Sequence, residues 1–176
     1  MVPVAARVPH AGRSRGQESR LVRRQDLAVP LIRLVSLAVL LWAPYADRRA
    51  LAVLADAPAV RGVGLGLYVI GFAGILWTGM ALGKQLSLHV TIQEGHELVT
   101  TGPYRYIRHP RYLAVLAFML GFALTFRSWA GVGGAALLAL IFLWRIHDEE
   151  TLLAREFGPA WHAYASRSWR LLPRVY

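Results

Sequence analysis

The sequence predicts an all-α membrane protein with four or five transmembrane helices, a small cytoplasmic hairpin or loop, and a helical cytoplasmic tail. Of its 176 residues 56% are hydrophobic and only 17% are charged, whereas soluble domains carry about a quarter charged residues. The apolar residues gather in four runs, at 27–46, 62–82, 112–126 and 129–146. The composition argues against a soluble enzyme and a disordered chain, and the absence of cysteine argues against a disulfide-linked secreted module.

The first 26 residues are expected to form a flexible basic arm, because they hold six arginines and no apolar periodicity. A basic start before an apolar run also resembles a signal peptide. This run is too long for that, and no convincing cleavage site follows it, so a signal anchor is favoured. A basic protein can also bind nucleic acid, but this requires a soluble basic face, and we expect no nucleic-acid partner.

The first two apolar runs each have the ~20 residues that a helix needs to cross the hydrocarbon core, and we assign residues 27–82 to an N-terminal pair of helices. The third run is shorter, and only Arg127 and Ser128 separate it from the fourth. This spacing predicts a tight helical hairpin whose first arm begins near Tyr106. Glycines in the second and fourth runs are expected to allow close helix packing, not to form a nucleotide-binding loop, which would follow a strand.

The basic residues predict the orientation. Fifteen of the twenty lie in segments 1–26, 83–111 and 145–176, four lie in the intervening connections, and Arg33 lies within the first run. Because cytoplasmic segments collect Arg and Lys, we expect both termini to be cytoplasmic, in a bacterial inner membrane. Arg33 either extends to the cytoplasmic headgroups or lines a polar cavity.

The segment after the second run predicts a small hairpin. Residues 87–92 alternate between polar and apolar, as a strand does, a turn follows, and 97–100 form a possible return strand. Pro103 and Pro110 exclude a continuous helix through the next stretch, and Pro110 suits the first turn of the following helix.

The tail is expected to be helical. The fourth helix continues out of the bilayer past Trp144 and becomes amphipathic, with Arg145 and Glu149 on one face because they are four residues apart. Gly158 is expected to end it, and Pro159 to begin a second short helix.

Polar side chains of the loop and the tail face the same predicted compartment. Singly, Arg108, His109 and Arg111 are ordinary positive-inside residues, and the acids at 148–150 merely solvate a helix end. Together, these groups can surround a charged ligand at the membrane boundary. No metal is expected, since the chain has no cysteine and no histidines at ligand spacing, and no motif of a Ser-His-Asp triad is present.

Five motifs follow one another in the second half of the chain: His96–Tyr104, Arg108-His109-Pro110-Arg111-Tyr112, Arg145 with Glu149-Glu150, Phe157-Gly158 and Leu171-Leu172-Pro173. In this order they resemble the isoprenylcysteine carboxyl methyltransferase family, whose wider group includes membrane phospholipid methyltransferases. The resemblance covers roughly residues 84–175, within the segment 83–176 that we assign as the methyltransferase core.

The resemblance implies a multi-pass membrane methyltransferase that binds S-adenosylmethionine on its cytoplasmic side. It implies that Arg145 is catalytic and faces the acidic group of the substrate, and that Glu149 is catalytic as well as holding the cofactor. The implied cofactor contacts are His96, Glu97, Leu98, Val99, Tyr104, His109, Pro110, Arg111, Tyr112, Glu149 and Glu150.

The acceptor is expected to partition into the membrane, as a carboxylate of the isoprenylcysteine kind or as a lipid. A carboxylate needs no general base, whereas an amine or phenol needs one, for which His109 or Glu149 are the candidates. Two alternatives stay open: an NADPH-dependent reductase of sterol or isoprenoid double bonds, and a non-catalytic protein that binds lipid or a partner. The oligomeric state also stays open, since the glycine-rich helices can pack within one chain or between two.

Overall fold

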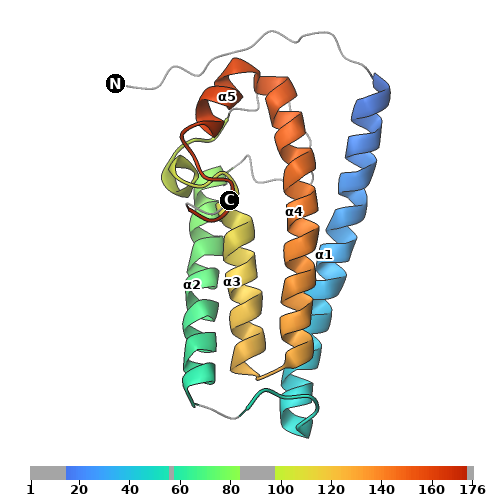
Figure 1. The fold of residues 1–176 in the computed structure, drawn as a ribbon, viewed down its shortest axis with the longest axis vertical. Helices are drawn as coiled ribbons and strands as arrows, with labels where there is room; N and C mark the ends of the chain where they lie inside the picture. The colour runs from blue at the N-terminus through green and yellow to red at the C-terminus, as the bar shows by residue number, and fades with distance from the viewer. Residues whose placement is uncertain (1–14, 56–57, 84–97, 174–176) are drawn as a thin grey trace.

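The computed structural model describes residues 15–55, 58–83 and 98–173. This part of the chain is helical, with no strand among its named elements. The elements, shown in Figure 1, are α1 (Arg15–Arg49), α2 (Pro58–Leu82), the 3-10 helix η2 (Gly102–Arg105), α3 (Pro110–Thr125), α4 (Trp129–Phe157) and α5 (Pro159–Ala165).

Three of the helices are long and apolar enough to cross a membrane: Leu27–Arg49 of α1, α2 and α4. The fourth apolar helix, α3, is shorter, with 16 residues. These findings confirm the prediction of an all-α membrane protein.

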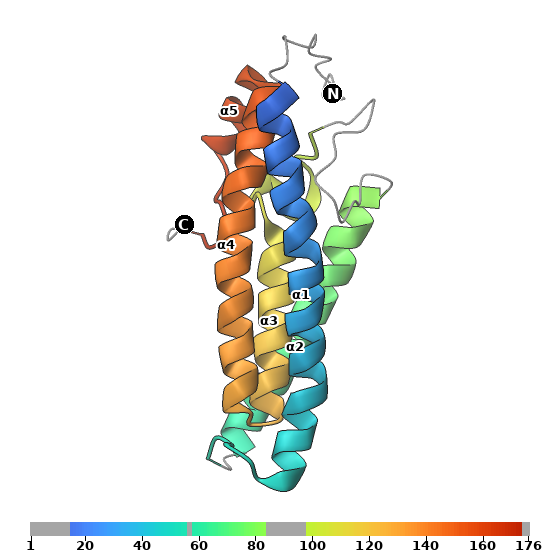
Figure 2. The ribbon, with the colours of Figure 1, turned by 90° about the vertical axis from the view of Figure 1, so that its right-hand side faces the viewer.

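The helices form a bundle centred on α3. Its most extensive contact is with α2 on one side, while α4 and α1 pack on the other side and against each other. Figures 1 and 2 show this arrangement, with α5 folded over one end of the bundle and the turn between α3 and α4 at the opposite end.

Glycines bring α2 and α3 close together, as the sequence predicted. A Cβ atom on Gly71 would collide with the backbone of Phe118, and one on Gly121 with the backbone of Tyr68. Not every glycine serves this purpose, because a Cβ on Gly62 or Gly66 would meet nothing within 4 Å. The contact between α2 and α3 therefore depends on particular helix positions.

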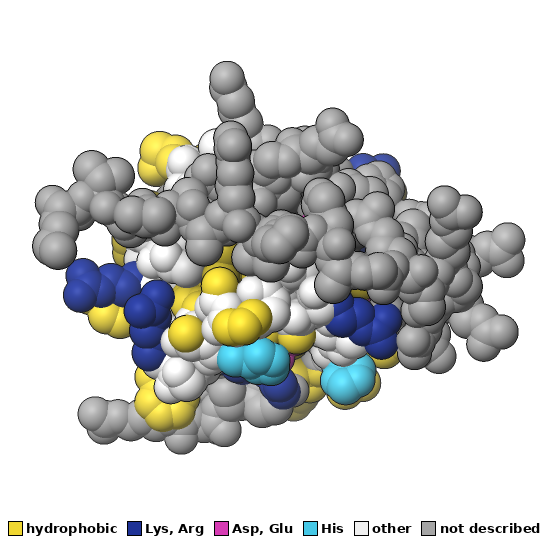
Figure 3. Space-filling view, turned by 90° about the horizontal axis from the view of Figure 1, so that it is seen from above, with side chains coloured by type: hydrophobic (Ala, Val, Ile, Leu, Met, Phe, Trp, Pro, Cys, Tyr) yellow, Lys and Arg dark blue, Asp and Glu magenta, His cyan; other side chains and the backbone are white. Residues whose placement is uncertain are grey.

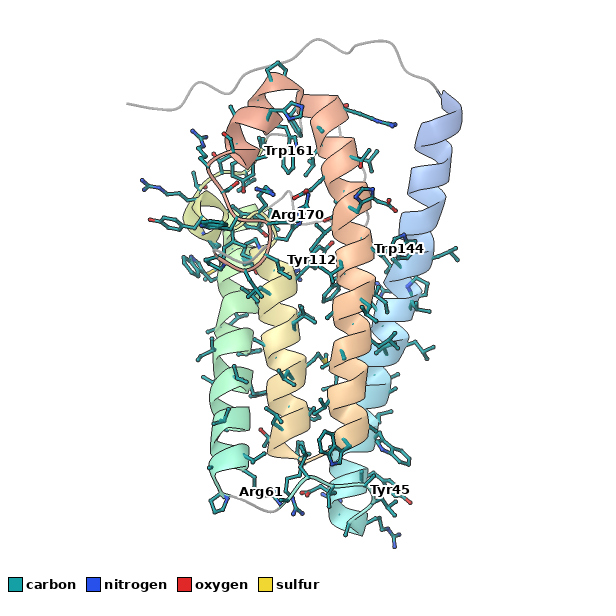
Figure 4. The ribbon with its side chains drawn as sticks, in the orientation of Figure 1. Tyr45, Arg61, Tyr112, Trp144, Trp161 and Arg170 are labelled. Atoms are coloured by element: carbon teal, nitrogen blue, oxygen red, sulfur yellow. The ribbon has the colours of Figure 1, made fainter. Side chains whose placement is uncertain are left out.

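Charged groups join α1, α2 and the turn at the end remote from α5. Asp47 of α1 accepts from Arg61 of α2 at 3.2 Å and from Arg127 of the turn at 2.8 Å. Ser128 caps α4 by accepting a hydrogen bond from the backbone N–H of Gly131 at 3.0 Å. Arg61 lies at this end in Figure 4. The tight hairpin predicted between the last two membrane helices is present.

Two helix starts differ from the predictions. α1 begins at Arg15, so that 15–26, expected to be irregular, are helical; Arg, Gln, Glu and Leu in this stretch are good helix formers that extend the apolar helix outward. α3 begins at Pro110 and not near Tyr106. The residue before a proline is disfavoured in the α conformation, and His109 accordingly has φ −120° and ψ 53°.

The predicted cytoplasmic hairpin falls largely on residues 84–97, outside the described residues. Residues 98–100, the end of the expected return strand, have no regular secondary structure. Arg33 is exposed on α1, which favours extension toward the headgroups over a place in an internal cavity.

The helices predicted for the tail are confirmed. α4 runs on to Phe157 and ends at Gly158, whose φ of +47° is a left-handed conformation that glycine adopts without strain. Pro159 then begins α5. Because α4 continues past its apolar part without a break, its acids are held in register with the start of α3.

Candidate functional site

The segment before α3 pairs with the C-terminal tail as a short parallel ladder. The backbone N–H of Trp169 donates to the carbonyl of Tyr106 at 2.8 Å, and the N–H of Arg108 donates to the carbonyl of Trp169 at 2.7 Å. The N–H of His109 donates to the carbonyl of Arg170 at 3.1 Å. This pairing satisfies backbone groups ahead of Pro110 and fixes the direction of the His109 side chain.

His109 lies between the two acids of α4. Its Nδ1 is 3.4 Å from Oε2 of Glu149, and its Nε2 is 3.3 Å from Oε1 of Glu150. The histidine is only 7% exposed. Burial by itself would lower the pKa of His109, but the hydrogen bonds and charges of Glu149 and Glu150 outweigh this and raise it. The structure therefore favours a protonated imidazolium between two carboxylates.

Tyr112 links Glu149 to Arg145. The Tyr112 hydroxyl donates to Oε1 of Glu149 at 2.7 Å and accepts from Nε of Arg145 at 2.7 Å. The Tyr112 ring stacks on His109 and on Phe142, with ring centroids 5.7 and 4.6 Å apart. Figure 4 shows Tyr112 in the space between α3 and α4. Arg145 is buried at this level of the bundle.

Glu150 is held by two arginines. Nε of Arg108 lies 2.8 Å from its Oε1, and a terminal nitrogen of Arg170 lies 2.7 Å from its Oε2. Arg108 also donates to the backbone carbonyls of Ala165, at 2.9 Å, and of Ser168. The loop, the end of α4 and the tail thus meet at one carboxylate.

Two buried tyrosines close the side of the cluster next to η2. The Tyr164 hydroxyl of α5 donates to the backbone carbonyl of Tyr104 at 2.7 Å. Burial raises the pKa of Tyr104 and of Tyr164 to about 12. Both phenols therefore stay protonated at neutral pH and offer aromatic surface and O–H donors, not charge.

The acids lie beneath the surface of this end of the molecule. Figure 3 looks onto it from above and shows histidine and basic side chains, with almost no acidic surface among the described residues. The side chains of Glu149 and Glu150 are 16% and 12% exposed. Both acids therefore lie below a basic rim, where cationic side chains contact them.

The structure brings together five of the residues predicted for the site: His109, Tyr112, Arg145, Glu149 and Glu150. Pro110 is adjacent to them as the first residue of α3.

Other predicted residues lie elsewhere or are not described. A guanidinium nitrogen of Arg111 lies 3.7 Å from where a Cβ on Gly79 would stand, so this side chain reaches α2, and its charge also acts on Tyr104. Leu98 packs against the buried cluster of the tail helices, and Val99 is half-buried. His96 and Glu97 fall outside the described residues.

Sequence reasoning did not name Arg108 or Arg170 as site residues. It counted Arg108 among the groups that together can surround a charged ligand, and it left Arg170 in the cytoplasmic excess of positive charge. Sequence position offered a signal for each, since Arg108 opens the quoted motif that contains His109-Pro110, and Arg170 immediately precedes Leu171-Leu172-Pro173. The pairing of Arg170 with Glu150 depends on where the tail lies in the fold, and no local sequence pattern predicts that position.

Two curated proteins are similar in sequence to part of this chain. The chain is 35% identical over 108 residues to the nickel-cobalt-cadmium resistance protein NccN of Alcaligenes xylosoxydans xylosoxydans, which covers 58% of this chain and 49% of the relative. It is 33% identical over 105 residues to the cobalt-zinc-cadmium resistance protein CzcN of Cupriavidus metallidurans, covering 58% and 48%. The chain thus spans about half the length of the curated relatives it matches.

A match to a protein family bears on the predicted resemblance. Residues 60–160 match the phospholipid methyltransferase family. This segment is more than half of the chain and runs from α2 to the start of α5. It includes His109 and both acids of α4. The chain therefore belongs to the phospholipid methyltransferase family, the membrane methyltransferase group that its motifs predicted.

Proposed function

We propose that the chain transfers a methyl group from S-adenosylmethionine to an acceptor that partitions into the membrane. The observation that carries the proposal is the contact of His109 with both Glu149 and Glu150, which joins the two most specific motifs of the sequence in one buried cluster. Membership of the family supports methyl transfer over an NADPH-dependent reductase.

The residues of the cluster fit the chemical groups of S-adenosylmethionine, which, when bound, supplies a methyl group on a positively charged sulfur. Carboxylates such as Glu149 and Glu150 suit an ammonium group or ribose hydroxyls. The rings of Tyr104 and Tyr112 suit a sulfonium or an adenine face. The His109 imidazolium suits a carboxylate. We extend the cofactor site to the other residues that the resemblance implies: His96, Glu97, Leu98, Val99, Pro110 and Arg111.

Arg145 is proposed to orient the acceptor. It is 5% exposed and projects from α4 where the apolar part of the helix gives way to the acids. A buried guanidinium at this level suits the acidic group of a molecule whose apolar part stays in the bilayer. A carboxylate acceptor, which needs an orienting cation and no general base, is therefore preferred to an amine or phenol.

The cluster is proposed to face the cytoplasm of a bacterial inner membrane, with both termini on that side. The support is the charge distribution, since the segments 83–111 and 145–176 that build the site hold nine of the basic residues.

The test is donor binding by the full chain in lipid nanodiscs, measured by calorimetry with S-adenosylmethionine and, separately, with NADPH. We expect wild type to bind the first and not the second, and Glu149→Gln to lose binding. The matched control is Glu156→Gln, the same change two turns further along α4. Binding of NADPH alone would support the reductase, and binding of neither by folded protein would support a non-catalytic role. Either result would overturn the proposal.

A further inference from the structure

The tail residues 166–173 run beside the segment that precedes α3, and Arg170 of the tail contacts an acid of α4. The ladder with 106–109 sets their register, because the carbonyl of Arg170 accepts from the backbone N–H of His109 at 3.1 Å. Arg170 is thereby placed beside the histidine that contacts both acids. Figure 4 shows Arg170 between the tail and α3, above Tyr112.

The Arg170 side chain contacts the carboxylate oxygen of Glu150 that Arg108 and His109 do not contact. Oε1 of Glu150 is taken by Arg108 at 2.8 Å and by His109 at 3.3 Å, whereas Oε2 lies 2.7 Å from the terminal nitrogen of Arg170. A carboxylate held at both oxygens by charged donors cannot rotate without losing a strong hydrogen bond. Arg170 therefore fixes the plane in which Glu150 faces His109.

The contact between Arg170 and Glu150 is not needed to hold the tail on the bundle, because other groups already hold the tail there. Arg108 donates to the carbonyls of Ala165 and Ser168, and Leu171 is buried, with 7% exposure. The guanidinium of Arg170 instead points away from the tail and toward the acid of α4.

We propose that Arg170 is a positioning residue for the donor site. It holds Glu150 against His109, and His109 in turn holds Glu149 in the orientation that receives the donor. The folded tail is then part of the binding site, although Arg170 itself touches neither donor nor acceptor. This inference rests on the proposed function.

The experiment is a double-mutant cycle on the full chain in nanodiscs, with the dissociation constant of S-adenosylmethionine measured by calorimetry. The variants are Arg170→Gln, Glu150→Gln and the two combined. Arg170→Lys keeps the charge, and Arg167→Gln is the matched control, since Arg167 lies on the same tail and is exposed. Thermal unfolding of each variant reports separately on stability.

We expect Arg170→Gln to weaken donor binding about tenfold, since a hydrogen bond to a charged group is lost. Arg167→Gln should bind as wild type does, Arg170→Lys should restore most of the affinity, and the combined variant should bind no more weakly than Glu150→Gln, because contacting residues are not additive.

The inference would be overturned if Arg170→Gln bound the donor as tightly as wild type, even with a lowered unfolding temperature. It would also be overturned if the losses of affinity in Arg170→Gln and Glu150→Gln added in the combined variant. Both results require wild type to bind the donor, so they leave the proposed function intact. A wild-type chain that binds no donor would overturn the proposed function and this inference with it.

Discussion

The two neighbouring acids of α4 have different surroundings. Glu149 is held within the bundle by Tyr112 of α3 and Arg145 of its own helix, whereas Glu150 is held by arginines of the loop and the tail. His109 contacts both. Removing one member of a buried charged cluster leaves its partner charge uncompensated, which costs far more than an exposed ion pair. We therefore expect conservative substitutions to separate the roles of these residues better than alanine does.

Arg145→Gln is expected to spare donor binding and to abolish most turnover. Glutamine can still donate a hydrogen bond toward Tyr112, and His109 and Tyr112 still contact Glu149, but the cation that orients an acidic acceptor is lost. Calorimetry with S-adenosylmethionine and methyl transfer to lipid extract from labelled donor measure the two properties. Arg155→Gln, an exposed arginine further along α4, is the control. Equal losses of binding and turnover would contradict the separate assignment of Arg145.

Stability is expected to fall as the pH rises through the pKa of His109. The carboxylates raise this pKa, so the contribution of the imidazolium is fully present below the ordinary value near 6.5 and is lost above the raised one. Thermal unfolding in nanodiscs between about pH 6 and pH 9 measures this. His109→Gln should show a flatter profile over the alkaline part, and identical profiles for the two proteins would refute the ion pairs.

Helix packing sets the distance between α3 and its neighbours, and here backbone approaches backbone. Gly71 lies against Phe118, and Gly121 against Tyr68, with no space for a Cβ at either position. In a membrane, where apolar burial does not drive helices together, such close contact is a main source of association. The position of His109 at the start of α3 therefore depends on the same interface.

Gly71→Ala is expected to destabilise the bundle by about 1–3 kcal/mol, the usual cost of overpacking. Gly66→Ala, in the same helix, has open space and should be neutral or slightly stabilising, because alanine is the better helix former. Unfolding of both variants in the same detergent gives the comparison. Similar behaviour of the two would show that α2 and α3 are not in this register.

The sequence predicted elements well where one physical signal decides them. Hydropathy located the membrane helices, and Gly158 followed by Pro159 located the break between α4 and α5. Helix starts were less accurate, since hydropathy reports depth in the bilayer while α1 continues into polar residues from Arg15. In the site, the order of the motifs predicted that His109 and the acids of α4 belong to one cluster. The partnership of Arg170 with Glu150 was out of reach because it joins distant segments through tertiary structure.

At the scale of the whole molecule, the charge distribution and the proposed function favour the same end for the cytoplasm. Asp47, Arg61 and Arg127 form an ion-paired cluster at the end remote from α5, while most basic residues belong to the sequence segments 1–26, 83–111 and 145–176. The proposed function requires the same orientation, because its donor is supplied from the cytoplasm.

The orientation is directly measurable because the chain has no cysteine, so a single introduced thiol is a unique label. Ala59→Cys, exposed at the start of α2, and Ser166→Cys, exposed after α5, mark opposite ends of the bundle. In intact cells a membrane-impermeant maleimide should label Ala59→Cys alone, and after disruption it should label both. Labelling of Ser166→Cys in intact cells would place the acids of α4 outside, where no donor is supplied, and the proposed function would fail together with the orientation.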